Sequence, residues 1–406
     1  MKVLLVGSGG REHALAWKLS RTPGLELHAA PGNPGIASHG DCHPVRADDA
    51  EGLLGLAGAG GIGVDLVVIG PEAPLVAGVG DELRHSGIAV FGPGKAAARL
   101  EGSKSFAKEL MRAANVPTAA AMALARPPCV VKVDGLAAGK GVFVCRTQTE
   151  LDRGLREAAS YGGALVIEEL LEGEEVSLFA LSDGSRVVPL AAAQDFKRIG
   201  DGDAGPNTGG MGSYSPVPWL ENVDQLYEGI HQPVVEELAR RGTPFIGCLF
   251  AGLMLTDDGP KVLEFNARFG DPETQTILPR LEGDFLGALW AAANGDLSGV
   301  ELRAAETCSV TVVLAGPEYP ARSDYSGVPI EGIADAEESG ALVFHAGTAL
   351  RGDRLVTNGG RILNVTALGE DVDAARARTY EAVERISFKG AQYRTDIGSR
   401  VEHVVP

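Results

Sequence analysis

Three polar residues at the end of an apolar run form the clearest chemical pattern in the sequence: Glu264, Asn266 and Arg268. Because side chains alternate along a strand, Glu264 and Asn266 are expected on one face. Leu263 and Phe265 are then expected on the other. Two oxygen donors at this spacing suit Mg²⁺, which completes its octahedral shell with water and substrate phosphates. Arg268 can neutralise charge on a transferred phosphoryl group; the alternative is a polar edge strand facing solvent.

A glycine-rich segment at 134–141 separates two apolar runs and predicts a loop between two strands. It is not a P-loop, because the spacing between its glycines is one residue short and Gly141 replaces the Ser or Thr. A glycine loop on a hairpin can still fold over the phosphates of a nucleotide. Lys132 lies within the preceding apolar strand, where an ammonium group needs an anionic partner. Phosphate oxygens are one such partner, and a buried ion pair within the protein is the alternative.

An acidic run at 168–175 follows another apolar strand. Its backbone can offer C=O and N–H groups to the edge of an adenine ring, and one of its carboxylates can bind ribose hydroxyls. Acidic runs are more often solvated surface, so both interpretations stay open.

The first turn of the chain lies between a strand and a helix, where a dinucleotide-binding fingerprint begins. Glu12 stands where the third glycine of that fingerprint belongs, and no acid follows the second strand at 29–31. This pattern disfavours hydride chemistry with NAD. The backbone N–H groups of Gly9 and Gly10, with Arg11, still suit a phosphate at a helix N-terminus. A turn without a ligand is the alternative.

The hydrophobic pattern predicts the elements that position these residues. In the first hundred residues, apolar strands alternate with helices, which indicates a parallel sheet covered on both faces. A helix is expected at 103–114. After it, the strands at 129–133, 142–145, 165–168 and 176–181, joined by hairpins, predict a separate α+β subdomain. The polar stretch at 200–216 exceeds the about 12–15 residues usual for structureless loops, which predicts either a functional loop, such as a lid, or a disordered one. The expected strands lie at 3–6, 27–30, 65–69, 88–91, 129–133, 142–145, 165–168, 176–181, 247–255, 261–266, 309–314 and 361–367.

Length and charge narrow the class of protein. A chain of 406 residues predicts two to four domains, since a single core stops growing near roughly 250–300 residues. Its net charge of −18 argues against binding nucleic acid or anionic membranes. No apolar stretch reaches the ~18 residues of a membrane span, and the apolar run at 1–6 predicts a strand rather than a signal peptide. Five scattered cysteines without a CxxC pair indicate buried, reduced thiols in the cytoplasm.

The order of these features resembles the ATP-grasp superfamily: a lysine with a glycine-rich hairpin loop, an acidic hinge, and a Glu-x-Asn strand. Within that superfamily, nearly the whole sequence is similar to the phosphoribosylamine–glycine ligase family. The departures are small, since Val133 and Ser213 stand where the family often has alanine. The matching stretches are GGREHALAWKL (9–19), PGNPG (31–35), GPEAPLVAG (70–78), FGP (91–93), LEGSKSFAK (100–108), VVKVDGLAAGKGV (130–142), DGDAGPNTGGMGSYSP (201–216), LEFNARFGDPETQ (263–275), HAGT (345–348) and TNGGRIL (357–363).

This resemblance implies an ATP-grasp fold with α/β and α+β domains. It implies a Rossmann-like domain for the substrate phosphate at 1–100, an ATP-grasp domain at 101–304 with a hinged subdomain near 118–185, and a β-rich domain at 305–406. The implied reaction joins glycine to 5-phosphoribosylamine in de novo purine biosynthesis, with ATP giving ADP and phosphate through a glycyl phosphate. The implied cofactors are ATP and Mg²⁺ or Mn²⁺, in a cytoplasmic monomer or weak homo-oligomer.

The resemblance also assigns roles to residues. Glu264 and Asn266 are the implied metal ligands, and Arg268, Lys132 and Asp271 the implied catalytic residues. The implied substrate-binding residues are Gly9, Gly10 and Arg11 for phosphoribosylamine, Glu72 near its ribose or amine, and Asp195, Lys197, Arg198 and Asn207 near glycine. The implied ATP-binding residues are Lys104, Lys132, Gly135, Gly139, Lys140, Gly141, Glu168, Glu169, Leu171 and Glu175.

Three other functions remain to be weighed. Another ATP-grasp ligase would share the ATP-binding residues and differ only in its substrates. A non-catalytic nucleotide sensor would be expected to lack Glu264, Asn266 or Arg268, and all three are present. A dehydrogenase is disfavoured by Glu12 and by the missing ribose acid.

Overall fold

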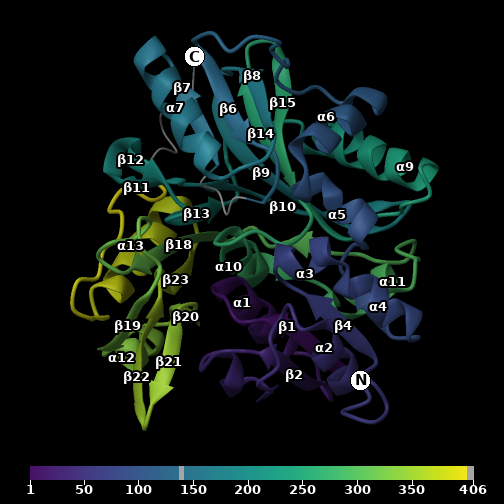
Figure 1. Ribbon diagram of the computed structural model, residues 1–406. Coiled ribbons are helices and arrows are strands. Elements are labelled where there is room, and N and C mark those ends of the chain that lie inside the picture. The colour runs from purple at the N-terminus through teal and green to yellow at the C-terminus, as the bar shows by residue number, and fades with distance from the viewer. Residues whose placement is uncertain (137–140, 400–406) are drawn as a thin grey trace.

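The computed structural model describes residues 1–136 and 141–399, and the predicted N-terminal parallel sheet is confirmed. Its five strands pair in parallel in the order β3-β2-β1-β4-β5. Val3 and Leu5 pack into one core and Leu4 and Val6 into another, so both faces are covered. The elements are β1 (Lys2–Gly7), α1 (Gly10–Leu19), β2 (Glu26–Pro31), β3 (Asp41–Cys42), α2 (Ala50–Ala57), β4 (Leu66–Ile69), α3 (Glu72–Ala77), α4 (Val79–His85), β5 (Ala89–Phe91) and α5 (Lys95–Gly102) (Figure 1).

An eight-stranded antiparallel sheet forms the centre of the molecule. It runs in the order β15-β14-β9-β10-β13-β18-β23-β20, so strands from the last hundred residues continue the sheet of the middle region without a break. The strands are β9 (Glu174–Asp183), β10 (Val187–Asp195), β13 (Gly212–Ser215), β14 (Ile246–Thr256), β15 (Gly259–Asn266), β18 (Cys308–Ala315), β20 (Leu342–His345) and β23 (Arg361–Gly369). The helices of the middle region are α6 (Lys104–Ala113), α8 (Val223–Leu226), α9 (Gln232–Arg240), α10 (Glu273–Ile277) and α11 (Phe285–Ala293).

A three-stranded sheet stands above the long sheet in Figure 1. It pairs β7 (Val142–Cys145), β6 (Cys129–Val133) and β8 (Leu165–Glu169), and helix α7 (Gln148–Ser160) packs on it. The sequence pattern placed the strand at 176–181 in this subdomain, and that placement is wrong. Strand β9 pairs with β10 and β14 instead, because it is a ten-residue run that is buried over most of its length and fits the centre of the long sheet.

The stretch at 200–216 is not the structureless loop that its composition predicted. It contains β12 (Ala204–Asn207), which pairs with β11 (Arg198–Gly200), and the buried strand β13. The hairpin tip is held by the C-terminal segment: Gly202 N–H donates to Asp396 Oδ2 at 2.9 Å, and Arg394 Nη1 lies 2.9 Å from Asp203 Oδ1. The polar groups of this hairpin are thus bound by residues nearly two hundred positions away in the sequence, and the local composition cannot reveal such partners.

The last hundred residues are rich in strands, as predicted. Four of the five cysteines are buried, and none forms a disulfide within residues 1–136 and 141–399. No helix in these ranges combines the length and the apolar content needed to cross a bilayer. The remaining elements are β16 (Leu281–Glu282), β17 (Arg303–Ala304), β19 (Tyr325–Pro329), α12 (Ile333–Glu338), β21 (Thr348–Arg351), β22 (Arg354–Gly359) and α13 (Val372–Val383).

Two buried histidines join the first helix to the C-terminal strands. The backbone N–H of His345 donates to His13 Nδ1 at 2.7 Å, and the two rings pack edge to face. Asn33 Nδ2 donates to the carbonyl oxygen of His345 at 2.9 Å. Burial lowers the pKa of His345 to about 4 and lowers that of His13 well below its usual range. This contact therefore requires neutral imidazoles.

The stability contributed by His345 should depend on pH. Its pKa is lower when folded than when unfolded, so the unfolded chain takes up a proton as pH falls below about 6.5 and stability is lost toward pH 4. The His345→Gln variant does not titrate there, so its deficit relative to the parent should shrink by about 2 kcal/mol between pH 7.5 and 5. Chemical denaturation at both pH values measures this change. The exposed His85→Gln serves as control, and a deficit that is constant with pH would contradict the prediction.

Candidate active site

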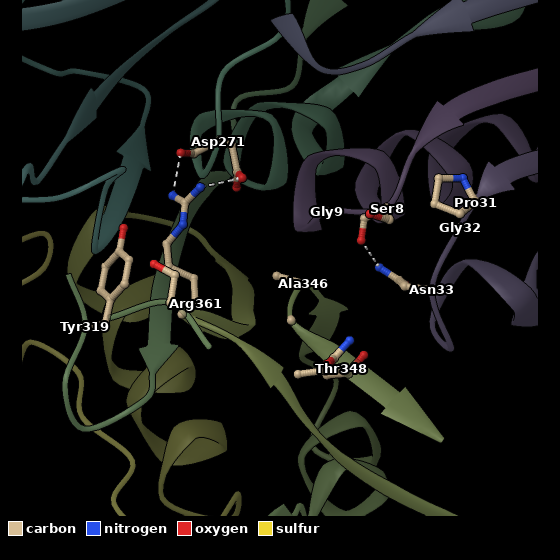
Figure 2. Close-up of a pocket in the computed structure, with 14 residues that line it drawn as sticks. Ser8, Gly9, Pro31, Gly32, Asn33, Asp271, Tyr319, Ala346, Thr348 and Arg361 are labelled. Carbon is tan, nitrogen blue, oxygen red and sulfur yellow. Dashed lines mark hydrogen bonds and ion pairs between the residues drawn. The ribbon is translucent and has the colours of Figure 1, made fainter. Parts of the chain in front are cut away.

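A cavity of about 520 Å³ lies where the first turn, the segment before α10 and the C-terminal loops meet. Because the order of the parallel strands reverses around β1 and β4, the carboxyl edge there is the usual place for a ligand. Figure 2 shows Ser8, Gly9 and Asn33 on one side and Ala346 and Thr348 on the other. Asp271 and Arg361 are the charged residues of its lining among the described part of the chain.

Asp271 and Arg361 form a bidentate contact at one end of this cavity (Figure 2). Arg361 Nη2 lies 2.6 Å from Asp271 Oδ2, and Nη1 donates to the backbone carbonyl of Asp271 at 2.7 Å. Arg361 also donates to the carbonyls of Gly209 and Gly210. Burial would lower the pKa of Arg361, but the charge of Asp271 raises it. The last third of the chain thus supplies a permanent cation to the site.

The first turn of the chain binds the side-chain carboxylate of Glu12. Gly9 N–H donates to Glu12 Oε2 at 2.6 Å, and Arg11 Nε donates to Glu12 Oε1 at 2.6 Å. Residues Gly7 and Gly70 leave room for this buried side chain, since a Cβ on Gly70 would lie 2.1 Å from Glu12 Oε1. Arg11 is buried and does not line the cavity. Its expected role at a substrate phosphate stays a prediction, while Gly9 does line the cavity.

Arg268 lies between two acidic residues. Its Nε is 3.1 Å from Glu72 Oε2, and its Nη2 is 3.0 Å from Glu101 Oε1. Burial would raise the pKa of Glu72, but the charges of Arg268 and Arg11 lower it to about 2. Burial prevails at Glu101, whose pKa is raised. Burial would also lower the pKa of Arg268, but Glu101 and Glu72 raise it above its usual range, so the guanidinium stays charged.

Strand β15 contains a bulge that changes the predicted alternation. Glu264 and Val262 pair with adjacent residues of β14, which leaves Leu263 outside the ladder. Val262 and Phe265 consequently pack into the same core. The prediction that Leu263 shares a face with Phe265 is therefore wrong, because the extra residue shifts the register. The ladder is regular from 264 to 266, which places Glu264 and Asn266 on one face as expected.

The donors on β15 suit a hard cation. No group of three or more His, Cys, Asp or Glu with metal-binding geometry exists within 1–136 and 141–399. Glu264 and Asn266 offer two oxygens, which fits Mg²⁺ or Mn²⁺ when phosphates and water complete the shell. Asn266 Oδ1 accepts a hydrogen bond from Arg268 Nη2 at 3.2 Å, so Arg268 contacts one of the two residues that are expected to bind a metal.

Lys132 has the anionic partner that its position required, and this partner is a carboxylate. Its Nζ lies 2.7 Å from Glu168 Oε2 and donates to the carbonyl of the bulged Leu263 at 2.9 Å. Lys108 Nζ lies 2.7 Å from the other oxygen, Glu168 Oε1. The alternative of a buried ion pair is thus what the structure shows. An ammonium group has three N–H donors, and contacts with described residues use two of those on Lys132, which leaves one that could bind a phosphate oxygen.

The acidic hinge separates into two environments. Glu169 Oε1 accepts from Ala120 N–H at 2.8 Å, and this bond, with the charge of Lys261, lowers its pKa. Leu171, two residues farther along the chain, is buried. Glu175 lies farther along, where its Oε2 is 2.7 Å from Lys197 Nζ. The carboxylates of Glu168 and Glu169 therefore bind other parts of the protein and are not a solvated acidic run. The carboxylate of Glu175 pairs with Lys197.

Asp195, Lys197 and Glu273 form an ionisable group next to this hinge. Lys197 Nζ lies 2.9 Å from Asp195 Oδ1, and although burial lowers the pKa of Lys197, the two carboxylates around it raise it well above its usual range. Burial, followed by the charge of Asp195, raises the pKa of Glu273 to about 7. Arg198 and Asn207 pair across the β11–β12 hairpin and do not line the cavity.

The start of the glycine loop is tied to helix α6. Lys104 Nζ donates to the carbonyl of Gly135 at 3.0 Å, and Ser105 Oγ donates to Asp134 Oδ2 at 2.5 Å. Burial lowers the pKa of Lys104, with Glu264 acting in the opposite direction. At the other end, Val133 N–H donates to the Gly141 carbonyl at 2.8 Å. The expected ATP contacts Gly139 and Lys140 lie outside the described residues.

Four residues at or next to the cavity were not predicted: Asn33, Arg361, Glu273 and Gln275. Asn33 and Arg361 line the cavity, Gln275 contacts Asp271, and Glu273 faces Asp195. All four occur in stretches rich in Gly, Pro and Asn that matched the family, PGNPG, GDPETQ and TNGGRIL. Those stretches were a usable signal, but they are distant in sequence, and only the fold brings them together.

Comparisons with known proteins agree with this geometry. Models of the phosphoribosylglycinamide synthetase N domain, ATP-grasp (A) domain and C domain match residues 1–101, 102–274 and 309–400. The chain is 52% identical to phosphoribosylamine–glycine ligase of Streptomyces coelicolor over 98% of this chain and 99% of that protein. It is 48% identical to the enzyme of the same name from Agrobacterium fabrum, over 98% of each.

Solved structures show the same fold. The crystal structure of phosphoribosylamine–glycine ligase from Thermotoga maritima matches with a TM-score of 0.85 and 35% identity, over 98% of this chain and 100% of that chain. Biotin carboxylase from Campylobacter jejuni matches with a TM-score of 0.70 and 13% identity, over 99% and 95%, which shows the fold alone. ATP-grasp enzymes use ATP and divalent metals. The chain belongs to the phosphoribosylglycinamide synthetase family and is an ATP-grasp ligase.

Proposed function

We propose that this ligase joins glycine to 5-phosphoribosylamine, giving glycinamide ribonucleotide, ADP and phosphate. One observation carries the proposal: an unbroken series of contacts links the metal strand to the cavity. Asn266 contacts Arg268, and Arg268 contacts Glu72. Arg11 lies 3.9 Å from Glu72 and is paired with Glu12, which binds the N–H of the cavity residue Gly9. Phosphoryl transfer and amine attack can thus share one charged network.

The cavity is proposed to hold phosphoribosylamine. Its volume lies within the roughly 300–1,000 Å³ usual for small-molecule sites. Arg361 supplies positive charge for the phosphate, and Thr348 and Asn33 offer polar groups along the wall. Asp271 lies close to Gly9 in the cavity wall, since a Cβ on Gly9 would lie 4.0 Å from Asp271 Oδ2. We assign Asp271 to the amine, because a carboxylate accepts a hydrogen bond from an attacking N–H.

The acyl phosphate is proposed to form on the other side of Arg268. A glycine carboxylate oxygen attacks the terminal phosphorus of ATP, and ADP leaves. The amine nitrogen then attacks the acyl carbon, phosphate leaves, and the nitrogen loses a proton. Lys104 and the third N–H of Lys132 would hold phosphate oxygens, while Arg268 stabilises the developing charge. Glu264 and Asn266 would hold Mg²⁺ or Mn²⁺, which neutralises phosphate charge when bound.

The adjoining residues would complete the substrate sites. The backbone at 168–171 is proposed to meet the adenine edge, with Glu175 at the ribose and the loop at 135–142, of which 137–140 lie outside the described residues, over the phosphates. Asp195 and Lys197 are proposed to hold the glycine end, and Arg198 and Asn207 to shape its loop. We further propose that the protein acts in the cytoplasm as a monomer or weak homo-oligomer, on small molecules and without nucleic acid or membrane partners.

ADP release tests the proposed reaction. With ATP and Mg²⁺ present, ADP should form at the full rate only when both glycine and phosphoribosylamine are supplied, and glycinamide ribonucleotide should appear in equal amount. A matched series replaces glycine by alanine or by β-alanine. ADP formation that ignores glycine would contradict the proposal and favour another ATP-grasp ligase. Binding of ATP without any turnover would favour a nucleotide sensor.

A further inference from the structure

Gln275 lies directly behind the cavity residue Asp271. It is on α10, one helical turn after Asp271, and is fully buried. Its Nε2 donates to Asp271 Oδ1 at 2.6 Å, while Arg361 holds Oδ2 at the same distance. Each oxygen of the carboxylate therefore has its own donor, and the two donors come from different parts of the chain. With both bonds in place, the carboxylate cannot rotate freely.

The other end of the Gln275 amide has no such partner. Since a carboxylate only accepts hydrogen bonds, the amide nitrogen must face Asp271, and Oε1 must point away. Oε1 is buried and without a hydrogen-bond partner among the described residues. An unpartnered buried acceptor costs folding free energy. The side chain is therefore poorly explained by stability alone, and its one strong contact is with Asp271.

Three regions of the chain meet at this amide. A Cβ on Gly10, at the start of α1, would lie 2.7 Å from Gln275 Nε2 and 2.3 Å from Asn364 Nδ2 on β23. Asn364 is also buried, and its Oδ1 likewise has no hydrogen-bond partner within the described residues. Only glycine leaves room at position 10, so the first helix packs against the amide that holds Asp271.

We propose that Gln275 is a positioning residue that orients the Asp271 carboxylate toward the amine of phosphoribosylamine. This inference rests on the proposed function, which gives Asp271 its substrate. Arg361 alone would leave Asp271 free to turn about the remaining contact. With Gln275 in place, the carboxylate is already oriented before the substrate binds. The conformational entropy of the Asp271 side chain is then lost during folding and not during binding.

Two substitutions test this role. Gln275→Leu keeps the volume and removes the donor, so KM for phosphoribosylamine should rise about 10-fold, as for other residues that orient a functional group. KM for ATP should stay within twofold of the parent value, since the proposed ATP site lies on the other side of Arg268. Gln275→Glu should give a larger rise at high pH, because an ionised carboxylate repels Asp271.

The pH profile separates positioning from mere packing. Burial and the charge of Asp271 raise the pKa of the acid introduced by Gln275→Glu. As pH falls it becomes protonated and can donate to Asp271 again, so its KM penalty should shrink. The penalty of Gln275→Leu should not change with pH. The charged groups that meet this position are Asp271 and, through it, Arg361, whereas Gly10 and Asn364 do not titrate.

Thr276→Val is the matched control. Thr276 is equally buried on the same helix, but its hydroxyl bonds Ser213 and Thr311, so this variant should lose stability without changing either KM. Gln275→Leu should add nothing to Asp271→Asn, because both act through one carboxylate. If Asp271→Asn leaves turnover unchanged, the proposed function of Asp271 fails. If Asp271→Asn impairs KM while Gln275→Leu does not, or the two effects add fully, the positioning role alone is overturned.

Discussion

Replacing Glu264 with glutamine is expected to lower kcat at least about 100-fold while the chain remains folded. Glutamine keeps the size and one oxygen of the side chain but removes the charge that offsets a divalent cation. Glu264 is partly exposed and forms no described ion pair, so its neutralisation leaves no buried charge unpaired. The loss should therefore concern metal and phosphate rather than the fold.

The measurement is ADP release titrated with Mg²⁺ and with Mn²⁺, together with thermal unfolding. The metal concentration for half-maximal rate should rise, and the thermal midpoint should stay near that of the parent. Glu228→Gln, an exposed acid on the segment before α9, is the control and should behave as the parent. Near-normal turnover of the Glu264→Gln variant at low metal concentration would remove Glu264 from the metal site.

Replacing Arg268 with methionine should impair both stability and catalysis. The side chain separates two carboxylates, the nearly buried Glu101 and the partly exposed Glu72, and removing the cation leaves them without a charge between them. Loss of one partner from a buried ion pair costs about 3–5 kcal/mol. Turnover should also fall at least about 100-fold, because the charge near the transferred phosphoryl group is lost. Denaturation and kcat measure the two effects separately.

The stability loss of Arg268→Met should depend on pH. In the parent, Glu72 has its pKa lowered to about 2, which adds stability above its unfolded pKa near 4.5. Without Arg268, Glu72 keeps only Arg11 as a neighbouring cation and the raised pKa of Glu101 should rise further, so stability is lost as pH rises. The deficit should therefore be smaller at pH 6 than at pH 8.

A second substitution separates the two roles of Arg268. Adding Glu101→Gln to Arg268→Met should restore part of the stability, since one buried charge is removed, but it should not restore turnover. Arg303→Met breaks only an exposed pair with Glu282 and should change stability by less than about 1 kcal/mol. Recovery of turnover in the double variant would show that Arg268 acts on the fold and not on the reaction.

Much of the fold followed from local pattern. The alternating strands and helices before residue 102 predicted the parallel sheet, because strands buried on both faces must be continuously apolar. The bulge at Leu263 could not be predicted, since it depends on how β15 meets β14. The placement of β9 in the long sheet likewise depends on its partners. Local composition also gave no indication that the C-terminal segment holds the tip of the β11–β12 hairpin.

The site divides in the same way. Residues close in sequence were recognisable: the pleat of one strand brings Glu264 and Asn266 together, and Arg268 follows directly after that strand. Lys132 was recognisable as a cation needing an anion, but its partner Glu168 lies on a neighbouring strand. The domain boundaries expected near residues 100 and 304 stay a prediction, and the long sheet runs continuously past the second of them.

Residue types alone were enough to predict the chemical groups of this ligase: the expected metal donors, the lysines, the glycine loop and the family to which the chain belongs. These groups can be recognised because their residues stand close together in the sequence, where the local backbone geometry sets the distance between side chains. The tertiary structure decided which carboxylates pair with which cations, and it built the cavity from Gly9, Asn33, Asp271 and Arg361. Such pairings join residues as distant in sequence as Glu72 and Arg268, and they depend on burial and distance, which no local pattern contains.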